Sequence, residues 1–192
     1  MSSQSGRKIL PEYENPVDNV LIEIADVLAP SFKHYGMTPN MITGLSAFFG
    51  ILCLYFFHRR SFIHAGVCFF IQYFFDCMDG FYARKYKMTS KMGDVYDHVK
   101  DAMVNAGLLY MFYKTDDWIG IALLLITTIC VSIQLGCQEV MYNSDESPTL
   151  SFTKQIAPCT TKDESHAFMP YVRWIGCGTW NLVLAMYIMS RK

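Results

Sequence analysis

Long apolar runs dominate the chain and alternate with short polar segments. The first run, residues 41–58, holds no Asp, Glu, Lys or Arg. At about 1.5 Å rise per residue, a helix of this length just crosses the hydrocarbon core of a bilayer, which is about 30 Å thick. Four further runs follow at residues 62–75, 102–113, 118–138 and 170–189. The pattern predicts an all-α integral membrane protein, a bundle of five transmembrane helices.

The segment before the first run has an amphipathic pattern instead. Its apolar residues follow the spacing of one helical face, acidic residues occupy the other, and Pro16 and Pro30 bound it. We expect residues 1–37 to form a cytosolic N-terminal segment with an amphipathic helix on the membrane surface, and residues 38–192 to form the transmembrane domain. Because an acidic face is not typical of lipid-surface helices, packing against another protein element stays open.

Local signals place the ends of the predicted helices. Thr38 is a suitable N-cap and Pro39 a suitable first residue for the first spanning helix, which the basic residues after His58 close. The other helices are expected at residues 61–84, from near residue 93, at 117–141 and at 168–189, with a polar loop at 142–166.

The basic residues favour one orientation in the membrane. With a cytosolic N-terminus, nine Lys and Arg residues of the connecting segments lie on the cytosolic side and five on the opposite side. Short cytosolic loops are enriched in Lys and Arg, so this bias favours a cytosolic N-terminus. We therefore expect a multi-pass protein, of an endoplasmic reticulum type membrane if the source is eukaryotic, whose polar motif faces the cytosol.

That motif is a set of four aspartates beside the apolar runs. Asp76 and Asp79 are three residues apart, and Asp97 and Asp101 are four apart, so each pair projects from one face of a helix. An unpaired carboxylate in a spanning segment costs about 2.5–3.5 kcal/mol, which calls for a compensating charge. Together the four offer eight oxygens, ligands suited to hard divalent cations such as Mg²⁺ or Mn²⁺. Two solvated helix ends are the alternative.

Small residues and an arginine lie between the two acidic pairs. Gly80, Ala83 and Gly93 would let a ligand approach the backbone, and Arg84 offers a planar fork of donors for a phosphate. Ordinary helix packing and a basic flank would explain the same residues.

In order, these residues match the signature of a known family. The chain resembles the CDP-alcohol phosphotransferases, also called CDP-alcohol phosphatidyltransferases, at Asp76, Asp79, Gly80, Ala83, Arg84, Gly93, Asp97 and Asp101. The resemblance implies a membrane enzyme of phospholipid biosynthesis that transfers a phosphoalcohol group from a CDP-alcohol to an alcohol and releases CMP. It also implies a two-metal site with Mg²⁺ or Mn²⁺. Family members usually have six spanning helices, which leaves six as the alternative to five, and homodimers are common among them.

The resemblance assigns roles to single residues. Asp101 is the candidate base that takes the acceptor's proton, and the four aspartates are the metal ligands. His98, directly after Asp97, is similar to a residue of the cholinephosphotransferase and ethanolaminephosphotransferase branch and is the alternative base. The residues expected to contact the cytidine diphosphate are Asp76, Gly80, Ala83, Arg84 and Gly93.

The substrates stay open because two clues conflict. His98 favours CDP-choline or CDP-ethanolamine as donor and diacylglycerol as acceptor. The length of 192 residues is closer to that of phosphatidyltransferases, which join CDP-diacylglycerol to a polar alcohol such as inositol, glycerol phosphate or serine. Arg173, in the last apolar run, is a candidate ligand for an anionic acceptor; a place at the membrane interface would equally explain it.

Composition excludes several other functions. Seven scattered cysteines lack the spacing of a zinc site or a disulfide framework, and the net charge of −1 gives no sign of nucleic-acid binding. No cleavable signal peptide is apparent at the start of the chain. The rival function is a cation or proton pathway through the membrane. Such a pathway would need the acids but not Gly80, Ala83 and Arg84 at fixed spacing.

Overall fold

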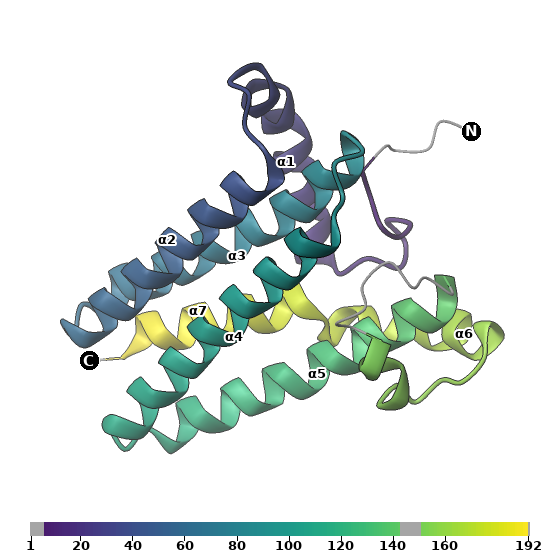
Figure 1. Ribbon diagram of the computed structural model, residues 1–192. Coiled ribbons are helices and arrows are strands. Elements are labelled where there is room, and N and C mark those ends of the chain that lie inside the picture. The colour runs from purple at the N-terminus through teal and green to yellow at the C-terminus, as the bar shows by residue number, and fades with distance from the viewer. Residues whose placement is uncertain (1–5, 143–150, 192) are drawn as a thin grey trace.

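The computed structural model describes residues 6–142 and 151–191, and every regular element in these two ranges is helical (Figure 1). The elements in chain order are α1 (Pro16–His34), α2 (Pro39–His58), α3 (Phe62–Lys85), α4 (Lys91–Lys114), α5 (Trp118–Tyr142), the 3₁₀ helix η1 (Ser151–Gln155), α6 (Lys162–Val172), the 3₁₀ helix η2 (Arg173–Ile175) and α7 (Cys177–Ser190). The expected all-α class is thus confirmed for the described residues.

Five helices form a closed ring. Going round it, α2 packs on α3, α3 on α7, α7 on α5, α5 on α4, and α4 again on α2. The helix α1 lies outside this ring, against α3 and α7, and α6 packs on α5. The ring leaves room at its centre for a cavity, which the next subsection describes.

One end of the ring is filled by apolar side chains. Phe57, Phe62 and Phe112 stack edge to face there, with ring centroids 5.2–5.4 Å apart. At the same end Arg191 pairs with Asp117 at 2.5 Å, and the Tyr187 hydroxyl donates to Asp117 at 2.5 Å. We call this the closed end.

Two of the helices have the length and apolarity of a membrane span, Pro39–His58 and Trp118–Met141. The helices α3 and α4 carry the acidic motif, which lowers their hydropathy. The count of five or six spans therefore stays a prediction. Thr38 accepts a hydrogen bond from Met41 N, and Pro39 begins α2, so the predicted start of the first spanning helix is confirmed.

The prediction of one helix over residues 168–189 is wrong. The chain forms the end of α6, the short η2 and then α7, with Gly176 in extended backbone between them. A Cβ at Gly176 would stand 2.0 Å from Gln134 Oε1, because the Gln134 amide accepts a hydrogen bond from Cys177 N at 2.7 Å. The Gln134 side chain of α5 thus occupies the space beside Gly176 and binds the backbone there, and the helix is interrupted at this point.

The predicted loop over residues 142–166 is also wrong in part. Residues 143–150 lie outside the described part, but η1 and the start of α6 lie within the predicted loop. Thr161 and Glu164 form a capping box that begins α6. The sequence carries this signal, since a Thr is followed three residues later by a Glu.

The helix α1 presents apolar residues on two sides. Leu21, Ile22 and Ala25 are buried against the bundle, whereas Val20 and Val27 are exposed. The expected helix is confirmed, although it continues through Pro30 to His34. Packing against protein explains the buried side, and the exposed apolar side fits the predicted place at the membrane surface.

Candidate functional site

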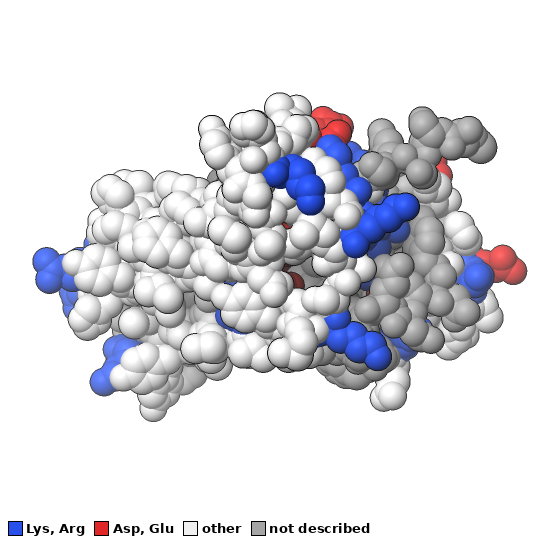
Figure 2. Space-filling view, turned by 45° about the horizontal axis from the view of Figure 1, so that its top comes forward, with Lys and Arg blue, Asp and Glu red and all other residues white. Residues whose placement is uncertain are grey.

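The ring encloses a cavity of about 1110 Å³ that opens away from the closed end. Its lining comes from α1, α3, α4, α5, α7, the start of α2, the segment between α3 and α4, and the N-terminal segment. Figure 2 shows Lys and Arg side chains around a hollow in which acidic side chains are visible. The rim is therefore basic and the interior acidic.

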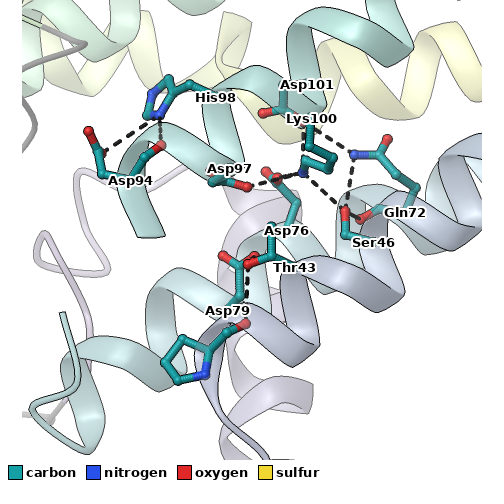
Figure 3. Close-up of polar contacts among 11 residues, drawn as sticks. Thr43, Ser46, Gln72, Asp76, Asp79, Asp94, Asp97, His98, Lys100 and Asp101 are labelled. Carbon is teal, nitrogen blue, oxygen red and sulfur yellow. Dashed lines mark hydrogen bonds and ion pairs between the residues drawn. The ribbon is translucent and has the colours of Figure 1, made fainter. Parts of the chain in front are cut away.

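Three of the four predicted metal ligands converge inside this cavity. Asp76 reaches in from α3, and Asp97 and Asp101 reach in from α4 (Figure 3). One carboxylate oxygen of each lies within 4.8 Å of the other two. The same-face spacing in each helix and the packing of both helices on α2 produce this convergence.

Asp79 lies beside this group and has a different partner. It is one turn further along α3, and Thr43 of α2 donates a hydrogen bond to its Oδ2 at 2.6 Å. The side chain is buried and lines the same cavity. The structure thus places Asp79 at the site but outside the three-carboxylate cluster.

A lysine that the sequence analysis missed lies between the three carboxylates. Lys100 is 3% exposed, and its Nζ contacts Asp76 Oδ1, lies 2.8 Å from Asp101 Oδ1 and lies 3.1 Å from Asp97 Oδ1. It also donates to Ser46 Oγ of α2 at 3.1 Å. The sequence does show that Lys100 directly precedes Asp101, but this position does not reveal in which direction the long, flexible lysine side chain points.

The donor set fits a hard cation. The Lys100 ammonium has three hydrogens, whereas four oxygens surround it. Asp97 Oδ1 is buried and accepts no hydrogen bond among the described residues. One ammonium cannot balance the charge of three carboxylates, and a metal ion with oxygen ligands would supply the missing positive charge.

The residues expected to contact a cytidine diphosphate line the same cavity. Gly80, Ala83, Arg84 and Gly93 follow the aspartates toward the basic rim. A Cβ at Gly93 would stand 3.0 Å from Ser90 Oγ and 3.1 Å from Asn40 Oδ1, so the turn before α4 is closely packed. The structure therefore brings the predicted metal and nucleotide residues together.

The N-terminal segment crosses this part of the site. The Arg84 side chain donates from Nε to the carbonyl oxygen of Gly6 at 2.9 Å. Gly6 has a φ of 118°, in the region that favours glycine, and a Cβ there would stand 2.7 Å from Phe81. Residues that the sequence analysis assigned to a separate segment thus form one wall of the cavity.

His98 lies at the site but is turned toward its own helix. Its Nδ1 is 2.7 Å from the Asp94 carbonyl oxygen and 3.7 Å from the Asp94 carboxylate. Asp101, the other candidate base, belongs to the carboxylate cluster, and Gln72 Nε2 donates to its Oδ1 at 3.4 Å.

Arg173, the predicted acceptor ligand, lies outside the cavity lining. Its Nη1 donates to the Glu12 carbonyl, and its guanidinium lies 5.4 Å from the Trp174 ring centroid. The structure places it where it holds the N-terminal segment against η2.

Two further carboxylates line the cavity on the α1 side. Asp18 accepts from the Tyr73 hydroxyl at 2.6 Å and from Gly178 N at 3.2 Å, and Glu14 accepts from Asn15 N at 3.2 Å. Burial raises the pKa of Asp18 to about 6, and burial together with the nearby Asp18 raises the pKa of Glu14 to about 7. The sequence analysis had placed Asp18 on the polar face of an amphipathic helix and had not singled out Glu14.

Comparison with known proteins gives one family. A family model described as CDP-alcohol phosphatidyltransferase matches residues 36–162. An archaetidylinositol phosphate synthase from Pyrococcus horikoshii is 28% identical over 103 residues, which are 54% of this chain and 50% of that protein. The match thus spans about half the length of this curated relative. No solved structure matches significantly.

Proposed function

Since the chain belongs to the CDP-alcohol phosphatidyltransferase family, we propose that it is a membrane enzyme of phospholipid synthesis. It transfers a phosphoalcohol group from a CDP-alcohol to a hydroxyl acceptor and releases CMP. The observation that carries the proposal is the meeting of Asp76, Asp97 and Asp101 with Arg84 in one cavity. A cation pathway would need the acids but not the arginine beside them.

The donor diphosphate is held between the acids and the basic rim. Asp76, Asp79, Asp97 and Asp101 would hold a divalent cation, and its positive charge would favour attack at the phosphorus and departure of CMP. Arg84 donates its planar fork to the diphosphate oxygens, and the hydrogen bond to Gly6 orients the guanidinium for that contact.

Asp101 serves as the base in this proposal. The acceptor oxygen forms a bond to the phosphorus that carries the alcohol, and the bond from that phosphorus to the bridging oxygen breaks, so CMP leaves with that oxygen. Asp101 takes the hydroxyl proton. The contact of His98 Nδ1 with Asp94 makes His98 the weaker candidate for this role.

For the substrates we propose a lipid-linked CDP donor and a phosphorylated polyol acceptor. The relative named above is an archaetidylinositol phosphate synthase, which supports an acceptor of the inositol phosphate class. Lys87 and Lys91 line the cavity near its rim and would attract such an anion. Diacylglycerol, the acceptor that His98 suggested, would bring no charge to this rim.

The filled end of the ring argues against a continuous cation path. Phe57, Phe62 and Phe112 are buried and pack edge to face there, and the charged groups beside them, Arg191 and Asp117, are paired with each other. Charged groups that relay ions through a membrane protein face a water-filled route, which these aromatic side chains do not provide.

The test is release of CMP from purified protein in detergent. CDP-diacylglycerol with Mn²⁺ and inositol 1-phosphate should yield CMP and a phosphatidylinositol phosphate, whereas inositol, serine, or CDP-choline with diacylglycerol should yield far less. Asp97→Asn serves as the inactive control. If no donor and acceptor pair releases CMP, the proposed activity is wrong; if only CDP-choline with diacylglycerol does, the substrate class is wrong.

A further inference from the structure

Lys100 occupies a place where its charge has a specific consequence for metal binding. Its side chain is buried, and its neighbours in the structure are carboxylates from two helices, Asp76 on α3 and both Asp97 and Asp101 on α4. A lysine this deeply buried is retained only when its charge is compensated. The three carboxylates provide that compensation.

The hydrogen bonds of the ammonium leave part of the cluster unused. It donates hydrogen bonds to Asp76 and Ser46, and its shortest further contact is the ion pair with Asp101 Oδ1 at 2.8 Å. The remaining close oxygen, Asp97 Oδ1, is an ion-pair neighbour at 3.1 Å but accepts no hydrogen bond among the described residues. The cluster is thus divided into a part that the ammonium satisfies and a part around Asp97 that it does not.

We propose that the Lys100 ammonium takes the position of one cation, so that the free enzyme binds one divalent ion where the family resemblance implies two. The inference rests on the proposed function, because it assigns the aspartates to metal binding. The same oxygens of Asp76 and Asp101 cannot serve the ammonium and a second divalent ion at once, since like charges repel at such separations. The remaining ion binds at the Asp97 part of the cluster.

Lys100 then acts as a positioning residue. It holds Asp76 of α3 against Asp101 of α4, and its bond to Ser46 ties both to α2. Three helices of the ring are therefore aligned at the site before a metal ion arrives. A pre-aligned ligand set binds its ion without first ordering the side chains.

The experiment counts bound Mn²⁺ directly. Protein in detergent is freed of metal with EDTA, desalted and titrated with MnCl₂ without nucleotide, and free Mn²⁺ is read from its electron paramagnetic resonance signal. The wild type should bind one ion per chain and Lys100→Met, which keeps the length of the side chain but not its charge, should bind two. Lys114→Met, at the opposite end of the same helix, is the matched control and should bind one.

Equal counts in the wild type and in Lys100→Met overturn the inference, whether the shared number is one or two. If Lys100→Met does not survive metal removal, it is purified in Mn²⁺, desalted and analysed for total manganese by mass spectrometry, beside wild type treated identically. Two ions against one support the inference, and equal numbers reject it. Lys100→Arg keeps the charge and should bind one ion.

This result is separable from that of the activity assay. If CMP is released but the wild type binds two ions, the function stands and the role of Lys100 is wrong. If no substrate pair releases CMP while the count rises from one to two, the role of Lys100 stands and the proposed reaction is wrong.

Discussion

The two ends of the ring balance their buried charges in opposite ways. At the closed end one carboxylate, Asp117, faces one guanidinium, that of Arg191, whose central carbon lies 4.9–5.7 Å from the centroids of three phenylalanine rings. At the acidic end three carboxylates share one ammonium, that of Lys100. A one-to-one pair carries no net charge, whereas three carboxylates around one ammonium need a further cation. The first arrangement closes the bundle and the second prepares it to bind.

The contrast between the two ends would be wrong if the acidic end could lose a carboxylate without loss of activity. We expect Asp97→Asn to lower CMP release on the order of 100-fold or more, because it removes a metal ligand and the charge that attracts the ion. Asp117→Asn at the closed end should retain most of the activity. Initial rates at saturating donor, with folding checked by size-exclusion chromatography, measure both. Comparable losses in the two variants would contradict the assigned roles of the two ends.

The closed end should be the more important for stability. Arg191→Met leaves the Asp117 carboxylate without its cation, and we expect a cost of roughly 3 kcal/mol, or a drop in melting temperature of roughly 5–10 °C. The double variant with Asp117→Asn should recover part of this loss, since no unpaired charge remains. Thermal unfolding in detergent measures both variants. An unchanged melting temperature for Arg191→Met would show that the pair does not stabilise the ring.

Metal should stabilise the protein through the acidic end alone. Mn²⁺ at about 100 times its dissociation constant is expected to add about 2.7 kcal/mol to the wild type, because the folded state binds it and the unfolded chain does not. Arg191→Met should gain as much as the wild type, and Asp97→Asn should gain little. Melting curves with EDTA and with Mn²⁺ test this. Equal gains in all three proteins would mean that the ion binds elsewhere.

A pH-dependent effect, which vanishes in acid, concerns the carboxylates on the α1 side of the cavity. The pKa of Glu14 rises from 4.5 to about 7 on folding, so between these values the folded state holds more protons, and stability falls as the pH rises. Glu14→Gln removes this loss and should stabilise the protein at pH 8 by at most about 3 kcal/mol, with little effect at pH 4.5. Asp18, with a pKa of about 6, should retain part of the pH dependence. Melting temperatures across pH 4.5–8 measure the difference, and a variant that is equally stabilised at every pH would contradict this account.

Much of the fold follows from local patterns in the sequence. Thr38 and Pro39 mark the start of α2 because their preferences act within one turn. Asp97 and Asp101 project from one face of α4 because they are four residues apart, whatever the partner helix is. These features depend on neighbours in sequence, so the sequence predicts them.

Features that depend on distant neighbours could not be predicted in this way. The helix break at Gly176 is produced by Gln134 of α5, and the separation of Asp79 from the cluster is produced by Thr43 of α2. Lys100 was missed because a long side chain has many directions, and packing of α2 and α3 selects one. The contacts of Gln134 and Thr43 join helices that the sequence analysis had not paired.

The bond from Arg84 to Gly6 affects how the protein should be prepared. Gly6 lies against Phe81 at the side of the cavity expected to hold the nucleotide, whereas Arg191 lies at the closed end of the ring. An affinity tag fused ahead of residue 6 would enter the molecule beside that cavity and compete with donor lipid for its opening. A tag placed after Arg191 would leave from the aromatic end, so purification, reconstitution and immobilisation are best carried out from the C-terminus.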